Sequence, residues 1–302
     1  MRFSVELPTQ RVDAAEEFVS AAAIAEIART AEEAGFSACF VTDHPFPDKG
    51  WLDAGGHHTL DPFVALSFAA AATERLRVQT HILVLPYRNP FLIAKAAASL
   101  DVLSGGRLIL GVAAGYLESE FAALGADYVG RDATADQSLI AIVRAWSGEP
   151  VTMEGDGYRA RDNVMLPRPL QRPHPPLWIG GNSKRAIRRA VAHGDGWVPF
   201  PNPPALARHS RTAVLVSPAD LAGRIAYGKE LAAASGRERP LEICYALTTG
   251  RAVTADQMLE AVDEWARLGV GWLTVAVRGR TRAEYCDALR TFGAEVIARV
   301  PA

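Results

Sequence analysis

The clearest pattern in the chain is TERLRVQTHILVLPYRNPFLIAKAAASLDVLSGGRLILGVAAGYLESEFAALG, which occupies residues 73–125. It holds two short apolar runs rich in β-branched residues, 77–85 and 107–113, which are typical of buried strands. Between them, residues 89–104 have the length of a helix, open on Asn-Pro and end before Gly105 and Gly106. A strand, a helix and a second strand in this order predict a parallel pair joined by a right-handed crossover.

The same alternation extends along the chain on both sides of this stretch. Strands are predicted at residues 3–7, 38–42, 77–85, 107–113, 177–181, 196–200, 241–250 and 271–277. Helices are predicted at residues 22–34, 61–73, 89–104, 133–147, 184–193, 218–234, 255–268 and 282–299. Eight such units in 302 residues predict an α/β fold, a (β/α)8 TIM barrel that forms a single domain over residues 1–302. A doubly wound open sheet is the alternative, but no glycine-rich fingerprint follows the first predicted strand.

Two segments do not fit the alternation and are predicted to lie outside the barrel. Residues 151–169 alternate in polarity around Gly155-Asp156-Gly157, which predicts a peripheral hairpin. Residues 199–217 are rich in proline and polar residues, and we expect this insertion to form a mobile flap.

Composition and charge exclude several classes of protein. Hydrophobic residues make up 49% of the chain and charged residues 22%, which is typical of a folded domain. A formal net charge of −2 argues against a nucleic-acid-binding surface. The N-terminal residues show no signal-peptide pattern, and no uncharged apolar run reaches about twenty residues. Three scattered cysteines suit a reducing compartment, so we expect a cytoplasmic protein without a membrane span.

In a barrel, functional side chains gather just beyond the carboxyl ends of the strands. The end of the fifth predicted strand, Gly180-Gly181-Asn182-Ser183, is suited to an anion, because glycines expose backbone N–H groups and a helix N-terminus follows. Asn182 and Ser183 would add side-chain donors. The alternative is a tight turn in which Asn182 or Ser183 only caps the helix.

The second predicted strand ends in Asp43-His44, a candidate pair for acid–base chemistry, because imidazole exchanges protons near neutral pH. The alternative is a surface loop with two polar residues. His57, His58 and Asp61 lie nearby in sequence, but adjacent histidines point apart and Asp61 is placed to cap a helix, so no metal site is predicted.

For His81 and for the two glutamates Glu118 and Glu120, the local pattern indicates an ordinary structural role. His81 lies in an apolar strand, where a buried histidine with a hydrogen-bond partner is the ordinary case. Glu118 and Glu120 are expected to be solvated helix residues.

Together, these strand ends resemble one family, the luciferase-like flavin- and deazaflavin-dependent oxidoreductases, in particular those that use coenzyme F420. The resemblance rests on VTDH at residues 41–44, on residues 73–125, and on PPLWIGGNSKRAIRRAVAHGDGW at residues 175–197. The three motifs occur in the family's order, each at a strand end. The C-terminal third of the chain is consistent with the family but less distinctive.

The resemblance implies a role for each matching residue. His44 would transfer protons beside the reactive face of the deazaflavin, with Asp43 as its partner at the cofactor. His81 and Ile82 match a strand bulge that often contains a non-proline cis peptide and supports the ring. Other residues match positions that contact the cofactor tail or its phosphate, namely Ala114, Gly115, Glu118, Ser119, Gly180, Gly181, Asn182 and Ser183.

The resemblance implies F420-dependent hydride transfer to or from a small organic substrate, in a homodimer that pairs through Ala-rich helices beside the second to fourth strands. One departure is Tyr116, which stands where the family's sugar-phosphate dehydrogenases have a catalytic glutamate. The alternatives are an FMN-dependent monooxygenase on the same barrel and a non-catalytic flavin-binding protein.

Overall fold

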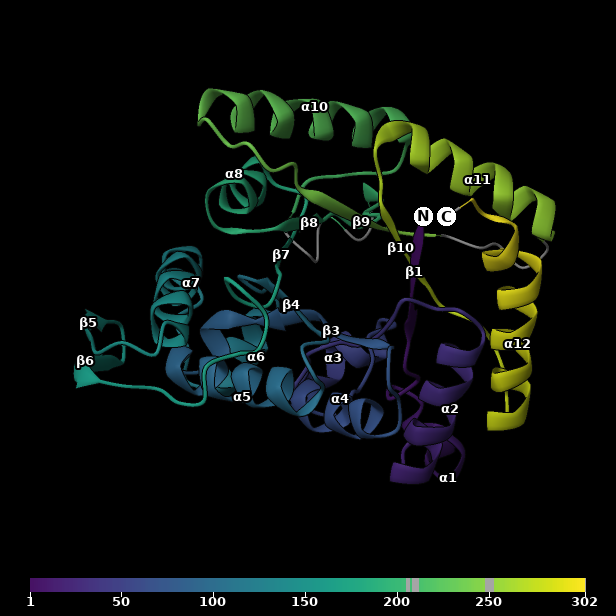
Figure 1. The fold of residues 1–302 in the computed structure, drawn as a ribbon, viewed down its shortest axis with the longest axis horizontal. Coiled ribbons are helices and arrows are strands. Elements are labelled where there is room, and N and C mark those ends of the chain that lie inside the picture. Colours follow the sequence, from purple (N-terminus) through teal and green to yellow (C-terminus); the bar gives the residue numbers. More distant parts are fainter. Residues whose placement is uncertain (205–206, 208–211, 248–252, 302) are drawn as a thin grey trace.

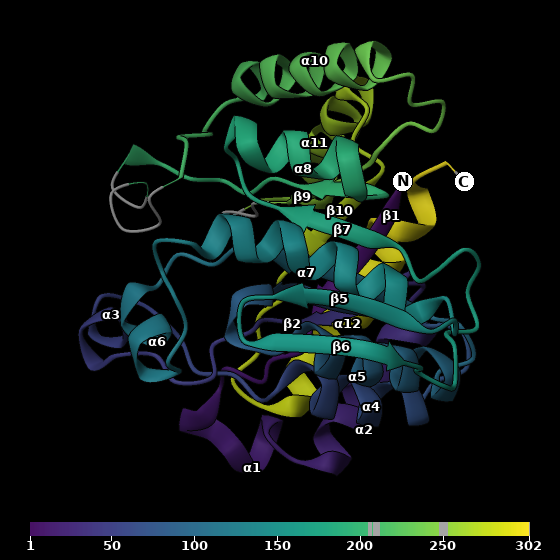
Figure 2. The same cartoon turned by 90° about the vertical axis from the view of Figure 1, so that its left-hand side faces the viewer.

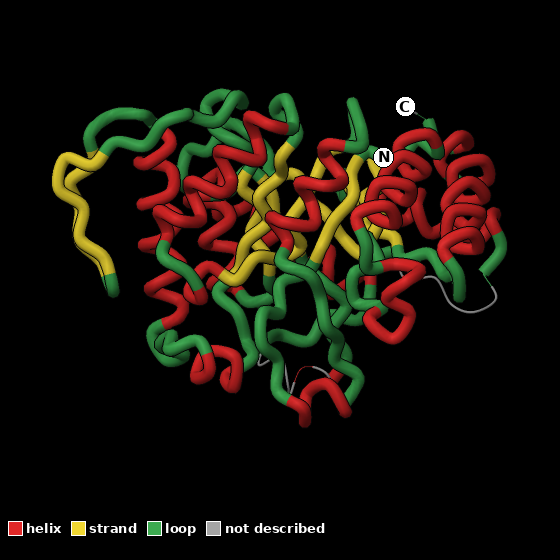
Figure 3. Tube along the Cα trace, turned by 90° about the horizontal axis from the view of Figure 1, so that it is seen from below, coloured by secondary structure: helices red, strands yellow, loops and turns green. Residues whose placement is uncertain are grey.

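Eight parallel strands close into a barrel, and helices surround it (Figure 3). The computed structural model describes residues 1–204, 207, 212–247 and 253–301. Around the barrel the strands follow the order β1 (Arg2–Glu6), β10 (Trp272–Val275), β9 (Glu242–Ala246), β8 (Gly196–Val198), β7 (Leu177–Gly180), β4 (Leu108–Ala113), β3 (Arg77–Val84) and β2 (Ala38–Val41). The predicted (β/α)8 architecture is confirmed. The end of the expected strand at 241–250 lies partly outside the described residues.

Each barrel strand is followed by one or two helices, as the alternation predicts (Figure 1). Asp61 and Asn89 cap their helices as expected, because their side chains accept hydrogen bonds from the first-turn N–H groups. The helices are α1 (Ala15–Phe18), α2 (Ala21–Glu33), α3 (Lys49–Asp53), α4 (Pro62–Ala71), α5 (Pro90–Leu103), α6 (Glu118–Ala123), α7 (Arg131–Trp146), α8 (Lys184–His193), α10 (Pro218–Ala234), α11 (Ala255–Leu268) and α12 (Arg282–Glu295). The described residues also include the 3-10 turns η1 (Val12–Ala14), η2 (Leu85–Tyr87) and η3 (Ile297–Arg299).

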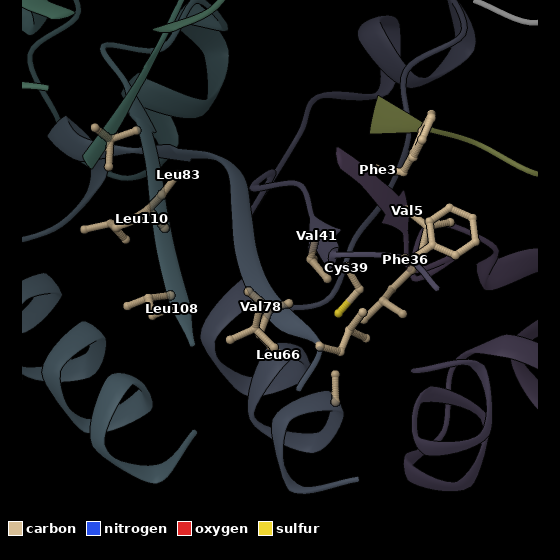
Figure 4. Packing of buried hydrophobic residues seen from close by; sticks show 14 of the residues in the cluster. Phe3, Val5, Phe36, Cys39, Val41, Leu66, Val78, Leu83, Leu108 and Leu110 are labelled. Carbon is tan, nitrogen blue, oxygen red and sulfur yellow. The ribbon is translucent and has the colours of Figure 1, made fainter. Parts of the chain in front are cut away.

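The core has two layers because successive strand residues face opposite sides. The outer layer lies between strands and helices, and Figure 4 shows part of it, with Val78 and Leu66 together between β3 and α4. The inner layer fills the barrel itself with a smaller cluster, Ala38, Ile109, Trp178, Val198, Cys244 and Trp272. Side chains therefore fill the interior of the barrel below the carboxyl ends of the strands, and a ligand can bind only at the mouth.

The expected peripheral hairpin is present as β5 (Val151–Gly155) and β6 (Tyr158–Asn163), an antiparallel pair outside the barrel (Figure 2). The turn passes through Gly157, whose φ of +73° suits glycine. Of the insertion at 199–217, residues 205–206 and 208–211 lie outside the described part, so the expected flap stays a prediction. Its described ends are joined by an antiparallel bridge between Asn202 and Leu215.

The mouth of the barrel, where the strands' carboxyl ends meet, is covered on one side by two short helices. α3 follows β2 and α6 follows β4, and the two lie side by side in Figures 1 and 2. A hydrogen bond from the Ser119 hydroxyl to the Asp48 carboxylate joins them. Among the described residues, no helix has the length and apolar character needed to cross a membrane.

The helices that follow β2 and β3 expose apolar side chains on the outside of the barrel. Val64 and Phe68 on α4 are 58% and 48% exposed, and Leu92 and Leu103 on α5 are 69% and 79% exposed. α4 and α5 lie next to each other, on the side of the barrel opposite α10 (Figures 1 and 2). Exposed apolar side chains gathered on neighbouring helices commonly mark an interaction surface.

We expect this α4–α5 face to pair two copies of the chain, burying well over about 1,000 Å² in all. Light scattering at micromolar concentration should return about twice the 32.4 kDa of one chain. Phe68→Arg should give the monomer mass, because a charge buried without a partner opposes association. Val216→Arg is the matched control, since Val216 is also exposed but precedes α10. A monomer mass for the unaltered chain would contradict the expectation.

Candidate functional site

A buried carboxylate joins three loops at the barrel mouth. Glu120, at the first turn of α6, is 0% exposed and accepts hydrogen bonds from His44 Nδ1 (3.0 Å), the Tyr87 hydroxyl (3.1 Å) and the Phe46 N–H (3.0 Å). The expectation that Glu120 is solvated is therefore wrong. The helix pattern missed this role because Glu120 lies on the face of α6 that turns toward the barrel mouth, next to the buried Phe121.

His44 lies over this carboxylate in a nearly closed aromatic pocket. Its side chain is 10% exposed, and its ring centroid lies 4.4 Å from Trp51, 5.0 Å from His57 and 6.0 Å from Tyr116. With Nδ1–H donating to Glu120, the Nε2 atom is the one left to exchange a proton. The structure records no hydrogen-bond partner for Nε2 among the residues it describes.

The neighbouring groups of His44 resist ionisation near neutral pH. Burial, with a smaller contribution from the charge of His44, lowers the pKa of His57 to about 4, and His57 Nε2 lies 3.1 Å from the Thr42 hydroxyl. Burial and the nearby Glu120 raise the pKa of Tyr116 to about 12, and burial also raises the pKa of Tyr87. The remaining ionisable contact in this pocket is the one between His44 Nδ1 and the Glu120 carboxylate.

Asp43 is buried at the end of β2, where it contacts residues at the end of β3. Its side chain is 1% exposed, accepts the Val84 N–H at 2.9 Å and forms a bidentate ion pair with Arg88 at 2.7 and 2.8 Å. These partners engage both carboxylate oxygens, and the expected role of Asp43 in catalysis and cofactor contact stays a prediction. Asp43 ties the end of β2 to the end of β3 and thereby fixes the loop that carries His44.

The expected bulge at the end of β3 is present. The pairing of β3 with β4 shifts between Thr80 and Leu83, and the His81–Ile82 peptide bond is cis, as the resemblance implies. Ile82 packs against the inner cluster of the barrel and forms part of the floor of the mouth. Glycines make room for it, since a Cβ at Gly180 would lie 3.2 Å from the Ile82 side chain.

His81 is partly buried and faces the same mouth. The Gln79 amide donates to its Nδ1 at 3.1 Å, and the Phe40 ring lies 4.6 Å away. Burial lowers the pKa of His81 to about 4. The ring is therefore neutral at physiological pH, and it matches the expected buried histidine with a partner.

The residues after β4 are closely packed at the backbone. Gly115 has φ +81°, and a Cβ there would lie 2.6 Å from Val84, so only glycine suits this position. Ala114 is partly buried, and Glu118 is exposed at the start of α6. Ser119 is engaged with Asp48, which also caps α3. The hydroxyl of Ser119 therefore fixes the two short helices.

The end of β7 leads into the N-terminus of α8, as predicted for an anion cradle. Gly181 has φ +118°, its N–H donates to Val198 O, and its carbonyl accepts from the Trp197 indole. Lys184 and Arg185 occupy the first turn of α8. Cations there oppose the helix dipole, and a bound anion would offset this cost.

Two side chains of this segment have structural roles. The Asn182 amide donates to the carbonyls of Phe200 and Ala213, which uses both of its hydrogens, and its oxygen accepts the Phe200 N–H. The Ser183 hydroxyl accepts the Ala186 N–H as the helix cap. The expected side-chain donor of Asn182 is therefore engaged within the protein, which leaves backbone N–H groups at the start of α8 as the candidates for holding an anion.

A cavity of about 720 Å³ opens on the opposite side of the mouth, at the ends of β1, β9 and β10. Glu6 lines it, and burial raises the pKa of this carboxyl from 4.5 to about 7. Glu6 is not among the predicted site residues, although a lone acid at the end of an apolar strand is a signal for it. Among the described residues, no three His, Cys, Asp or Glu side chains are placed to hold a metal ion.

The chain is similar in sequence to an F420-dependent dehydrogenase and to an FMNH2-dependent monooxygenase. Over 172 residues the chain is 38% identical to an F420-dependent glucose-6-phosphate dehydrogenase of Beutenbergia cavernae, a match over 56% of this chain and 49% of that protein. Over 130 residues it is 36% identical to an FMNH2-dependent dimethylsulfone monooxygenase of Pseudomonas putida, covering 42% and 35% of the two chains. These matches thus span half or less of the relatives' lengths.

Among solved structures, the monooxygenase RslO1 from Streptomyces bottropensis has the same fold, with a TM-score of 0.80 over 99% of both chains at 22% identity. The family model described as luciferase-like monooxygenase matches residues 1–295. The chain therefore belongs to the luciferase-like monooxygenase family.

Proposed function

We propose that this protein is an F420-dependent oxidoreductase that transfers hydride to or from a small organic substrate. The relatives that it matches include F420-dependent oxidoreductases and FMN-dependent monooxygenases. The choice of F420 is supported by the longer of the two matches, 172 residues against 130. Tyr116 offers a phenol of high pKa rather than a carboxylate, so oxidation of a sugar phosphate is not part of the proposal.

The observation that carries the proposal is the His44–Glu120 pair at the barrel mouth. Hydride transfer to a carbonyl, or from an alcohol, requires a proton to move in step with it. His44 presents Nε2 for that proton, while Glu120 orients the ring and stabilises its charged form. Trp51 and Tyr116 exclude water from one side of the imidazole.

The mouth of the barrel has features that fit a ring cofactor with a phosphate. Ile82 and Val198 form an apolar floor, and a Cβ at Gly111 would lie 2.2 Å from Thr80 O, so this position cannot carry a side chain. The N-terminus of α8 would hold the phosphate through its backbone N–H groups. When bound, the deazaflavin would supply the hydride chemistry, and the protein would supply position and the proton.

Titration of the purified protein with F420 and, separately, with FMN tests the cofactor. We expect F420 fluorescence to change with a dissociation constant at least tenfold lower than that for FMN, a difference of about 1.4 kcal/mol. Tighter binding of FMN would contradict F420 dependence and favour the FMN-dependent monooxygenase. If neither cofactor binds, both enzyme proposals are wrong.

His44→Ala should lower turnover by about 10²–10⁴-fold, the usual contribution of a general acid or base. Glu120→Gln should lower it in the same direction, because a neutral amide no longer stabilises positive charge on the ring. The measurement is the rate of oxidation of the reduced cofactor with menadione as acceptor. His58→Ala, an exposed histidine of the same loop, is the matched control. A loss of only a few-fold in His44→Ala would exclude the proton-transfer role.

Gly181→Val should weaken cofactor binding strongly. A branched side chain at φ +118° strains the backbone, and its Cβ would lie 3.2 Å from Ala186 in the first turn of α8, which displaces the N–H groups of the cradle. Gly236→Val is the control, since Gly236 also has positive φ but lies in open space after α10. Unchanged affinity in a folded Gly181→Val protein would reduce this segment to a helix cap.

A further inference from the structure

The cavity beside β1 lies at the barrel mouth, and its lining includes none of the residues to which the proposed function assigns a role. It measures about 720 Å³, within the range of cavities that hold small organic ligands. Part of its wall is apolar, with Pro8, Ala246, Leu247, Ala276 and Val277. A ligand with an apolar body therefore fits this wall. The polar and charged groups that line the rest of the cavity determine which polar group the ligand needs.

Glu6 is the acidic group at the inner end of this cavity. Ser4, two residues earlier on β1, donates a hydrogen bond to Gln79 inside the barrel, so alternation turns Glu6 toward the barrel mouth as well. Gln10 hydrogen-bonds to the Glu6 side chain, and the Tyr285 hydroxyl donates to its backbone carbonyl at 2.6 Å. With its pKa raised to about 7 by burial, this carboxyl is largely protonated at slightly acid pH.

The other charged groups around the cavity come from the residues after β1, those after β10, and α12. Arg11 pairs with Asp13 at 3.1 Å and donates to Gly279 O, and Arg280 pairs with Glu284 at 3.3 Å. Arg278 also lines the cavity, and within the described residues the structure records no ion pair or hydrogen bond for it. Within the described residues, the Arg278 guanidinium therefore has no counter-charge, and it lines the same cavity as the Glu6 carboxyl, whose pKa is raised by burial.

We propose that this cavity binds a small organic carboxylate with an apolar body, whose anion pairs with Arg278 and lies beside the carboxyl group of Glu6. The role of this carboxylate as substrate rests on the oxidoreductase function proposed above. Under that function, small organic carboxylates are the substrate class. An exposed arginine holds a carboxylate through a forked pair of hydrogen bonds. A neutral Glu6 adds a hydrogen-bond donor, whereas an ionised Glu6 would repel the ligand.

The sign of the pH dependence follows from the state of Glu6. Below about pH 7 the carboxyl is protonated and the cavity accepts an anion, and above it binding requires the uptake of one proton. Affinity for a carboxylate should therefore fall by up to about tenfold per pH unit above that value. Affinity for a neutral ligand of the same shape should not change, because it does not interact with the charge of Glu6.

Calorimetric titration of the full chain without cofactor tests the anion site, with benzoate as the probe and benzamide as its neutral counterpart. We expect benzoate to bind at least tenfold more tightly than benzamide at pH 6. Arg278→Gln should remove that preference, and the matched control Arg280→Gln, whose guanidinium is already paired with Glu284, should keep it. Failure of benzoate to bind, or equal affinity for the two probes, would overturn the proposal.

The Glu6→Gln variant tests whether the Glu6 carboxyl takes up the proton when the carboxylate binds. Benzoate titrations from pH 6 to 8, in buffers of different ionisation enthalpy, should show proton uptake and a fall in affinity for the unaltered chain. Both should be absent in Glu6→Gln, which should still bind benzoate at pH 8. An unaltered pH dependence in this variant would overturn the role of Glu6. Since no cofactor is present, failure here is distinct from failure of F420 to bind, which tests the enzyme proposal alone.

Discussion

The mouth of this barrel depends on one buried carboxylate. Glu120 is fully buried, and a charge in that position is tolerated only when several donors surround it. His44, Phe46 and Tyr87 supply those donors from the loops after β2 and β3, while Glu120 itself comes from the helix after β4. Three loops that are independent along the chain are thereby fixed to a common point. The orientation of His44 follows from this requirement.

A steric constraint shapes the surface below that point. The bulge in β3 turns Ile82 into the barrel, and the neighbouring strands accept it only because Gly111 and Gly180 have no Cβ. Lower down, Gly196 leaves space for the Trp178 indole, which a Cβ there would meet at 2.5 Å. Small residues on β4, β7 and β8 thus let large ones from β3 and β7 fill the interior. The result is a closed apolar floor with an open mouth above it.

The fold could be predicted from the sequence because strands and helices of the barrel alternate with clear caps and periodicity. His44 and Gly181 could be selected because each lies at or just after the carboxyl end of a strand. The roles of Glu120 and Asn182 could not be predicted, since each depends on contacts between segments far apart in the chain. Glu120 binds residues 33 to 76 positions away, and the Asn182 side chain holds a segment 18 to 31 positions away. Local pattern contains no information about such partners.

Glu6 and Glu120 are two glutamates of the same barrel mouth whose surroundings differ in hydrogen-bond donors and nearby charge. Glu120 accepts three hydrogen bonds, one of them from an imidazole that gains a positive charge when it takes a proton. Glu6 has the Gln10 side chain as its partner, and within the described residues no cation pairs with it, so desolvation dominates and favours its neutral form. The half of the mouth at β2 to β4 therefore places a histidine against a buried carboxylate, whereas in the half at β1, β9 and β10 burial raises the pKa of a carboxyl to about 7. This separation lets one mouth present a proton-exchanging group and, across from it, a surface that accepts negative charge.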